Sequence, residues 1–156
     1  VTLLEDASGA LQGYLNQGGK ILMNLSFPNT FDNNSVLQEY TPLDSVSTSP
    51  GSARLPTGNM VMPTAAFDAT YDSLEASVFL GRATPIYVKS TAEIMYTGDF
   101  TISGGWVGPD NVIARSINGS GHTNLVLASV ELHVLFGQPT NLQNFFNQVL
   151  LNEFNW

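Results

Sequence analysis

The chain opens with hydrophobic positions spaced three and four residues apart and then changes to a continuous apolar run. The first pattern covers Thr2–Gln17, begins with capping-box spacing, and predicts an amphipathic helix. Gly18 and Gly19 end this helix, since glycine readily takes the left-handed conformation at a helix exit. The run Lys20–Leu25 predicts a strand that is covered on both faces. Helix, glycine pair and buried strand together predict half of a β-α-β crossover in an α/β fold.

Shorter apolar runs later in the chain predict further strands. They occupy Ile86–Lys89, Glu93–Tyr96, Val112–Ile117 and Leu125–Leu132. The "NGSG" stretch, Asn118–Gly121, separates the last two runs and has the composition of a hairpin turn. The pair Gly104-Gly105 marks another turn, and Asp72–Phe79 predicts a short helix or turn. We therefore expect an antiparallel portion beside a parallel core.

Two other segments complete the outline. Residues 28–63 are rich in Asn, Ser, Thr, Pro and Gly and predict a long irregular loop, with a short helix at Ser35–Tyr40. Loops of this length are often functional. After Pro139, a capped helix is predicted by an apolar stripe made of Leu142, Phe145, Phe146, Val149, Leu150 and Phe154.

Composition narrows the class of protein. The 156 residues suit a single domain, 1–156, with one core. Charged residues make up 12%, about half the usual share, and uncharged polar residues replace them, as is common in secreted or cell-surface proteins. Five scattered bases face 13 acids, which argues against nucleic-acid binding. No apolar run predicts a transmembrane segment. The absence of Cys excludes a thiol nucleophile and a Cys-ligated metal.

Glu131 and His133 are the candidate catalytic pair. Two residues apart at the end of a predicted strand, they are expected on the same face, at the strand's carboxyl end. Such a pair suits general acid–base chemistry or metal ligation. The alternative is a polar pair that hydrogen-bonds to backbone or to the following loop.

Aromatic residues form the candidate ligand site. Trp106, with Tyr87 and Tyr96, predicts a platform for a sugar ring, and the alternative is ordinary packing in the core. His122 and Ser120 are interpreted as turn residues. The carboxylates match no EF-hand or D-x-D pattern, so no metal and no cofactor is predicted.

Both ends of the chain resemble one family. "LQGYLNQGGKILMN" resembles the helix–Gly-Gly–strand unit of the class I glutamine-amidotransferase-like superfamily, and "NLVLASVELHVLFGQPTNLQNFFNQVLLNEF" is similar to the closing strand, loop and helix of its non-catalytic members. The middle, "VLQEYTPLDSVSTSPG" through "GGWVGPDNVIARSINGSG", resembles stretches of secreted bacterial proteins. The resemblance implies a flavodoxin-like three-layer α/β sheet with helices. It argues against amidotransferase activity, because the chain has no Cys nucleophile.

These observations predict a non-enzymatic, secreted or cell-surface binding or structural domain, with a carbohydrate as the ligand class. The alternative is a hydrolase or sugar-processing enzyme that uses Glu131 and His133. The strand expected before Thr2 is missing and the chain lacks an initiator Met, so we expect the C-terminal portion of a larger protein. In a third hypothesis, this missing N-terminal segment or another chain supplies further strands.

Overall fold

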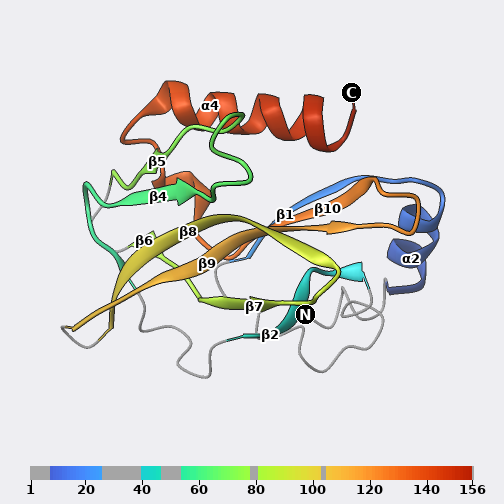
Figure 1. Cartoon of the computed structure of the whole chain (residues 1–156), viewed down its shortest axis with the longest axis horizontal. Helices are drawn as coiled ribbons and strands as arrows, with labels where there is room; N and C mark the ends of the chain where they lie inside the picture. Colours follow the sequence, from blue (N-terminus) through green and yellow to red (C-terminus); the bar gives the residue numbers. More distant parts are fainter. Residues whose placement is uncertain (1–7, 26–39, 47–53, 78–80, 103–104, 156) are drawn as a thin grey trace.

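The computed structural model describes residues 8–25, 40–46, 54–77, 81–102 and 105–155, and the fold in this part of the chain is mixed α/β (Figure 1). Its helical segments are α2 (Ser8–Asn16), the 3₁₀ turn η2 (Leu132–Val134), α4 (Pro139–Gln148) and the π-helical turn η3 (Val149–Glu153). None of these helices has the length and apolar character that a membrane span requires.

The main sheet has both parallel and antiparallel strands. In the described ranges it consists of β1 (Ile21–Asn24), β3 (Arg54–Leu55), β4 (Met60–Pro63), β5 (Leu74–Glu75), β6 (Gly81–Arg82), β8 (Ala92–Ile102), β9 (Gly105–Ile117) and β10 (Thr123–Ala128). The strand order is β1-β10-β9-β8-β3-β6, and β4 joins β8 to β5. The β1–β10 pair is parallel, and the other recorded pairs are antiparallel. A second, antiparallel sheet pairs β2 (Leu43–Val46) with β7 (Ile86–Val88).

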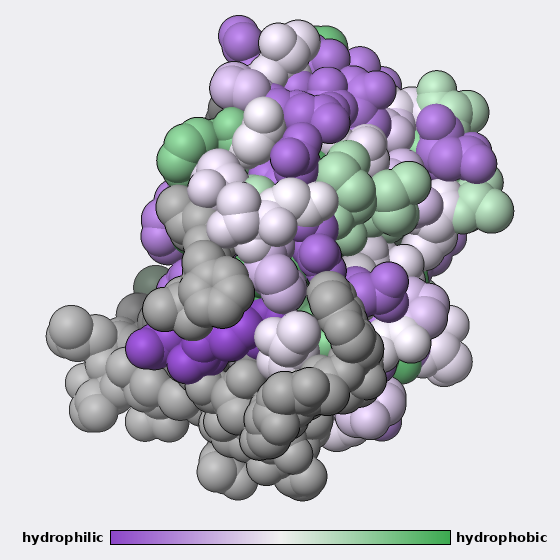
Figure 2. Space-filling view, turned by 90° about the vertical axis from the view of Figure 1, so that its left-hand side faces the viewer, coloured by the Kyte–Doolittle hydropathy of each residue, from purple (hydrophilic) through white to green (hydrophobic). Residues whose placement is uncertain are grey.

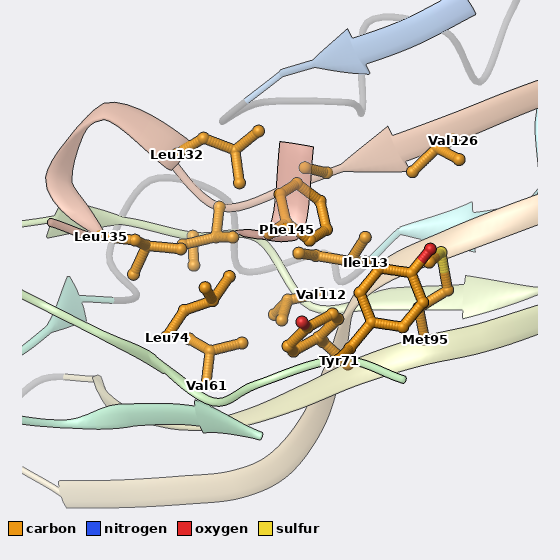
Figure 3. Packing of buried hydrophobic residues seen from close by; sticks show 14 of the residues in the cluster. Val61, Tyr71, Leu74, Met95, Val112, Ile113, Val126, Leu132, Leu135 and Phe145 are labelled. Atoms are coloured by element: carbon orange, nitrogen blue, oxygen red, sulfur yellow. The ribbon is translucent and has the colours of Figure 1, made fainter. Parts of the chain in front are cut away.

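The main sheet lies between two layers, α4 on one side and the β2–β7 pair on the other (Figure 1). Every residue of β10 is buried, as expected of a strand covered on both faces. Val126 and Ala128 belong to the larger hydrophobic cluster, which includes Phe145 of α4 (Figure 3). Leu125 and Leu127 belong to a smaller cluster with residues of β2 and β7. The period-2 alternation of β10 thus holds the three layers together.

The joint between α2 and β1 depends on glycine at two positions. Gly18 has φ +84°, and its N–H donates to Leu15 O at 3.0 Å, closing the helix. The Tyr14 ring lies directly over Gly19, where a Cβ would be 2.3 Å from Tyr14 Cε1. The Tyr14 hydroxyl also hydrogen-bonds the backbone of Lys20 at 3.2 Å. The glycine pair therefore allows the helix to end against its own tyrosine and the strand to begin at once.

Most sequence predictions of helices and strands are confirmed. The first helix is confirmed over Ser8–Asn16, and residues 2–7 lie outside the described part of the chain. The strands at residues 20–25, 86–89, 93–96 and 112–117 and the closing helix are confirmed, and the "NGSG" turn joins the antiparallel strands β9 and β10. However, β1 is the edge strand of the main sheet within the described residues and is half-buried to exposed, so it is not covered on both faces as the sequence predicts. The predicted helix at Ser35–Tyr40 falls outside the description except for Tyr40.

Three further predictions are wrong. Residues 28–63 are not irregular where the structure describes them, since β2, β3 and β4 lie there. Asp72–Phe79 contains the strand β5 in place of a helix. The strand predicted over Leu125–Leu132 ends at Ala128, because the chain turns there into η2. Short strands that pair with distant segments leave no clear period in the sequence, so their partners decide their structure.

A buried carboxylate fastens the end of the closing helix to the sheet. Glu153 is 3% exposed and accepts hydrogen bonds from the Tyr71 hydroxyl at 2.8 Å and the Thr123 hydroxyl at 2.9 Å. The Arg115 guanidinium donates to the same carboxylate and to Glu93 at 2.6 Å. Burial lowers the pKa of Arg115, but its hydrogen bonds to Glu153 and Glu93 outweigh burial and raise that pKa above its ordinary value.

We expect Glu153→Gln to lower the free energy of unfolding by about 3 kcal/mol, because it leaves a partly buried guanidinium short of one charged partner. The matched control is Glu93→Gln, whose side chain is 46% exposed in its ion pair. That variant should cost less than about 1 kcal/mol. Urea denaturation of the three proteins measures both values, and equal losses would contradict this account of the junction.

Candidate functional site

Glu131 and His133 do not have the geometry predicted from the sequence. β10 ends before them, so the expectation that one strand turns both side chains to one face is wrong. The Glu131 carboxylate accepts the backbone N–H of Arg82 at 3.0 Å, and the Glu131 N–H donates to Arg82 O at 3.0 Å. Glu131 therefore bridges η2 to β6 through the backbone, as the alternative interpretation of the pair expects.

His133 is exposed and lines an apolar groove of about 440 Å³ at the carboxyl ends of β1 and β10. The described residues around the groove are Leu22, Asn24, Leu132, His133, Leu142 and Phe146. His133 is the one titratable residue among them, so the groove brings no second acid or base to it. Within the described ranges, no three His, Asp or Glu residues are grouped as a metal site requires.

One residue of the predicted aromatic platform, Tyr96, is not available to a ligand. Tyr96 is completely buried and donates to Asp72 O at 2.8 Å, so its assignment as a ligand-binding residue is wrong. Its ring packs edge-on against Phe145 in the core. Tyr96 matches the alternative interpretation, an aromatic residue of the core.

Tyr87 and Trp106 lie on different parts of the molecule. Tyr87 is 57% exposed on β7, and β7 contacts the middle of β9, where the Asn111 amide donates to Ile86 O at 3.3 Å. Trp106 pairs through its backbone with Thr101, five residues farther along β9. At the usual rise per residue, that separation is about 16 Å between backbones along the strand. The role of Trp106 in ligand binding stays a prediction.

A polar pocket of about 340 Å³ lies at the opposite end of the sheet, beside α2 and the β9–β10 turn (right-hand side of Figure 1). The end of α2, the segment before β2, the β7–β8 turn and the adjoining ends of β9 and β10 enclose it. Its described lining consists of Leu15, Asn16, Tyr40, Thr41, Lys89, Thr91, Ala92, Ser116, Ile117, Asn118, Gly119, Ser120 and Asn124. One cation and no acid occur in this lining, although the whole chain has a net charge of −8.

Hydrogen bonds hold the walls of this polar pocket together. The Tyr40 hydroxyl donates to Asn16 Oδ1 at 3.2 Å, which joins the segment before β2 to the end of α2. Ser116 Oγ lies 2.9 Å from Tyr40 O and 3.2 Å from Asn124 Oδ1, so β9 and β10 meet the same segment. Lys89 Nζ donates to Thr41 O at 3.0 Å from the β7–β8 turn. The pocket is therefore a fixed feature of five cross-linked segments.

The "NGSG" turn forms one rim of the pocket. Asn118 Oδ1 accepts the backbone N–H groups of Ser120 and His122 at 3.0 and 3.1 Å, which fixes the turn internally. Gly121 has φ +80°, a conformation that favours glycine. This agrees with the interpretation of Ser120 and His122 as turn residues, and it places Gly119 and Ser120 in the pocket wall.

Thr41 is the unusual residue of the lining. Its side chain is 2% exposed, and its Oγ1 is the one buried side-chain polar atom in the described residues without a hydrogen-bond partner. More than about nine in ten buried polar groups in proteins have a partner, so this hydroxyl requires an explanation.

Sequence reasoning missed this pocket because five separated segments supply its lining. None of the segments carries a motif, and their polar residues resemble those of any uncharged surface. One signal points toward it: loops as long as the one predicted at residues 28–63 are often functional, and Tyr40 and Thr41 lie in that range. The Tyr40 partners Asn16 and Ser116, and Asn124 beside Ser116, are brought together only by the pairing of β9 with β10 and by the fold of α2.

Comparisons with protein-family models, curated proteins and solved structures give no match. On the face drawn in Figure 2, hydrophobic residues form small separate groups among hydrophilic ones. The polar pocket and the apolar groove are the candidate functional sites in the described part of the chain.

The buried tyrosines predict a loss of stability at alkaline pH. Burial raises the pKa of Tyr96 well above its ordinary value of about 10, and the Asp72 charge raises it further. Burial and then the hydrogen bond to Glu153 raise the pKa of Tyr71 in the same direction. Above pH 10 the unfolded chain loses these protons and the folded chain keeps them, so the free energy of unfolding falls as pH rises.

The expected slope is about 1.4 kcal/mol per pH unit for each of the two tyrosines. Tyr96→Phe removes one contribution, at the cost of the hydrogen bond to Asp72 O. Urea denaturation at several pH values between about 9 and 11.5 should show a shallower decline for this variant than for the unmodified protein. An identical pH dependence would refute the assignment of a raised pKa to Tyr96.

Proposed function

We propose that this chain is a non-enzymatic binding domain of a secreted or cell-surface protein, and that its polar pocket binds a carbohydrate. One observation carries the proposal: a pocket in a strongly acidic chain is lined by hydroxyl and amide groups and by no carboxylate in its described part. Sugars present neutral hydroxyl groups that both donate and accept hydrogen bonds. Hydroxyl and amide side chains supply both functions without a charge.

The size and lining of the pocket support a small ligand. About 340 Å³ lies within the range of about 300–1,000 Å³ usual for small-molecule sites. Leu15, Ala92 and Ile117 add apolar patches to the polar lining, and these suit the C–H faces of a sugar ring. The cross-links between Tyr40, Ser116 and Asn16 hold the site ready before the ligand arrives, which lowers the entropic cost of binding.

The family affiliation remains part of the proposal. A flavodoxin-like relationship to non-catalytic amidotransferase-like proteins is supported by the α2–Gly18–β1 unit and by the parallel pairing of β1 with β10. In this interpretation the domain corresponds to the C-terminal part of a flavodoxin-like α/β sheet, and this part serves for binding. The antiparallel strands β8 and β9 would be an addition of this chain to that plan.

The alternative function, a hydrolase or sugar-processing enzyme with Glu131 and His133, is less well supported. The Glu131 carboxylate is engaged by the Arg82 N–H, and His133 faces an apolar groove. Loss of a measured glycosidase activity on His133→Ala, with the fold intact, would restore the enzyme hypothesis.

Blocking the polar pocket should abolish sugar binding. Gly119 lines the pocket, and a Cβ added there meets no heavy atom within 4 Å, so Gly119→Phe adds bulk without distorting the turn. We expect it to weaken binding of neutral mono- and disaccharides at least about tenfold, because the ring occupies the ligand's space. Isothermal titration with glucose, galactose, mannose, xylose, N-acetylglucosamine and their disaccharides measures the effect.

The matched control is Gly9→Phe. Gly9 lies on α2, outside the pocket lining, and an added Cβ there also meets open space. This variant should bind sugar as the unmodified protein does. The proposal fails if the unmodified protein binds none of these sugars at millimolar concentration, or if the two glycine variants bind equally well.

A further inference from the structure

Thr41, whose buried hydroxyl has no hydrogen-bond partner, is one of the residues that line the polar pocket. Other buried polar side chains near the pocket and on its two strands do have partners: Asn124 accepts from Ser116, Thr123 donates to Glu153, and Ser129 donates to Val112 O at 3.0 Å. Thr41 Oγ1 stands apart from them in the described part of the chain. A buried polar group without a hydrogen-bond partner, in an interior whose other polar groups have one, is a candidate to hydrogen-bond the ligand.

The backbone around Thr41 is held firmly. Ser116 Oγ lies 2.9 Å from Tyr40 O, Lys89 Nζ donates to Thr41 O at 3.0 Å, and the Lys89 N–H donates to Pro42 O at 3.0 Å. Three consecutive carbonyl groups are thus occupied by two neighbouring elements. The backbone has little freedom to carry the Thr41 hydroxyl to another partner, so its isolation is built into the fold.

We infer that Thr41 Oγ1 is the specificity-determining group of the polar pocket and hydrogen-bonds a hydroxyl group of a neutral sugar. This inference rests on the proposed function. Oγ1 is covered in the free protein, and we expect a rotation of χ1 to another staggered position to turn it toward the pocket that Thr41 lines. A sugar hydroxyl fits the group best because it accepts or donates a hydrogen bond as the threonine rotamer requires.

The lining favours a neutral ligand over a cationic one. It offers the amide and hydroxyl groups of Asn16, Ser116 and Asn124 around Thr41, and it contains no described carboxylate that would bind a cationic ligand. The ammonium of Lys89 already donates to Thr41 O and fixes the wall. The ligand is therefore recognised by paired neutral hydrogen bonds, for which a single methyl-for-hydroxyl exchange is decisive.

The test uses Thr41→Val and Thr41→Ser in the whole chain. Valine keeps the shape of threonine but has no hydroxyl. Because Thr41 Oγ1 is buried without a hydrogen-bond partner in the free protein, Thr41→Val should raise the urea midpoint of unfolding. The same exchange should weaken the best-bound neutral sugar by about five- to tenfold in isothermal titration. Thr41→Ser keeps the hydroxyl and should bind within about twofold of the unmodified protein.

The outcomes separate this inference from the proposed function. If Gly119→Phe abolishes sugar binding and Thr41→Val does not weaken it, the pocket is the site and the role of Thr41 is refuted. A lower urea midpoint for Thr41→Val would also refute it, because the hydroxyl would then have a structural partner such as a bound water. If the unmodified protein binds no neutral sugar, the proposed function and the role of Thr41 both fail.

Discussion

The structure depends on one buried carboxylate, that of Glu153. Its partners Tyr71, Arg115 and Thr123 come from the turn after β4, from β9 and from the start of β10. A carboxylate removed from water is tolerated when charge and hydrogen bonds surround it, so the closing helix has one favourable position on the sheet. That position determines where Phe145 and Val149 enter the core, and it thereby determines how the layer of α4 and η3 packs on the sheet.

The same strands carry the junction on one face and the polar pocket on the other. Arg115 and Thr123 bind Glu153, and the residues that follow them in sequence, Ser116 and Asn124, hydrogen-bond each other in the pocket wall. Successive side chains of β9 point to opposite faces, so Arg115 and Ser116 serve both sides of the sheet. On β10, Thr123 and Asn124 do the same at the register shift between Thr123 and Leu125. Anchoring the helix therefore also fixes the register of the pocket wall.

The sequence could predict what depends on local pattern. The helix before Gly18, the strand β1 and the "NGSG" hairpin have signals within a few residues, and the structure has them, but β1 lies half-buried at the edge of the sheet. β3, β5 and β6 are two-residue strands that exist through their partners, and no local period marks them. The predicted geometry of Glu131 and His133 is wrong for a related reason, because it assumes that β10 continues as far as these residues. The polar pocket has no motif in the sequence, because only the tertiary fold brings its residues together.

The location of the pocket follows from the mixed sheet. In open parallel sheets the loops that bind ligands follow the carboxyl ends of the strands, and the sequence prediction for His133 relied on that rule. Here β8, β9 and β10 are antiparallel, so hairpin turns lie at both ends of the sheet. The β9–β10 turn therefore meets the end of α2 at the amino ends of β1 and β10 (Figure 1). Polar loop residues converge at that end, whereas α4 and η2 leave the carboxyl end apolar.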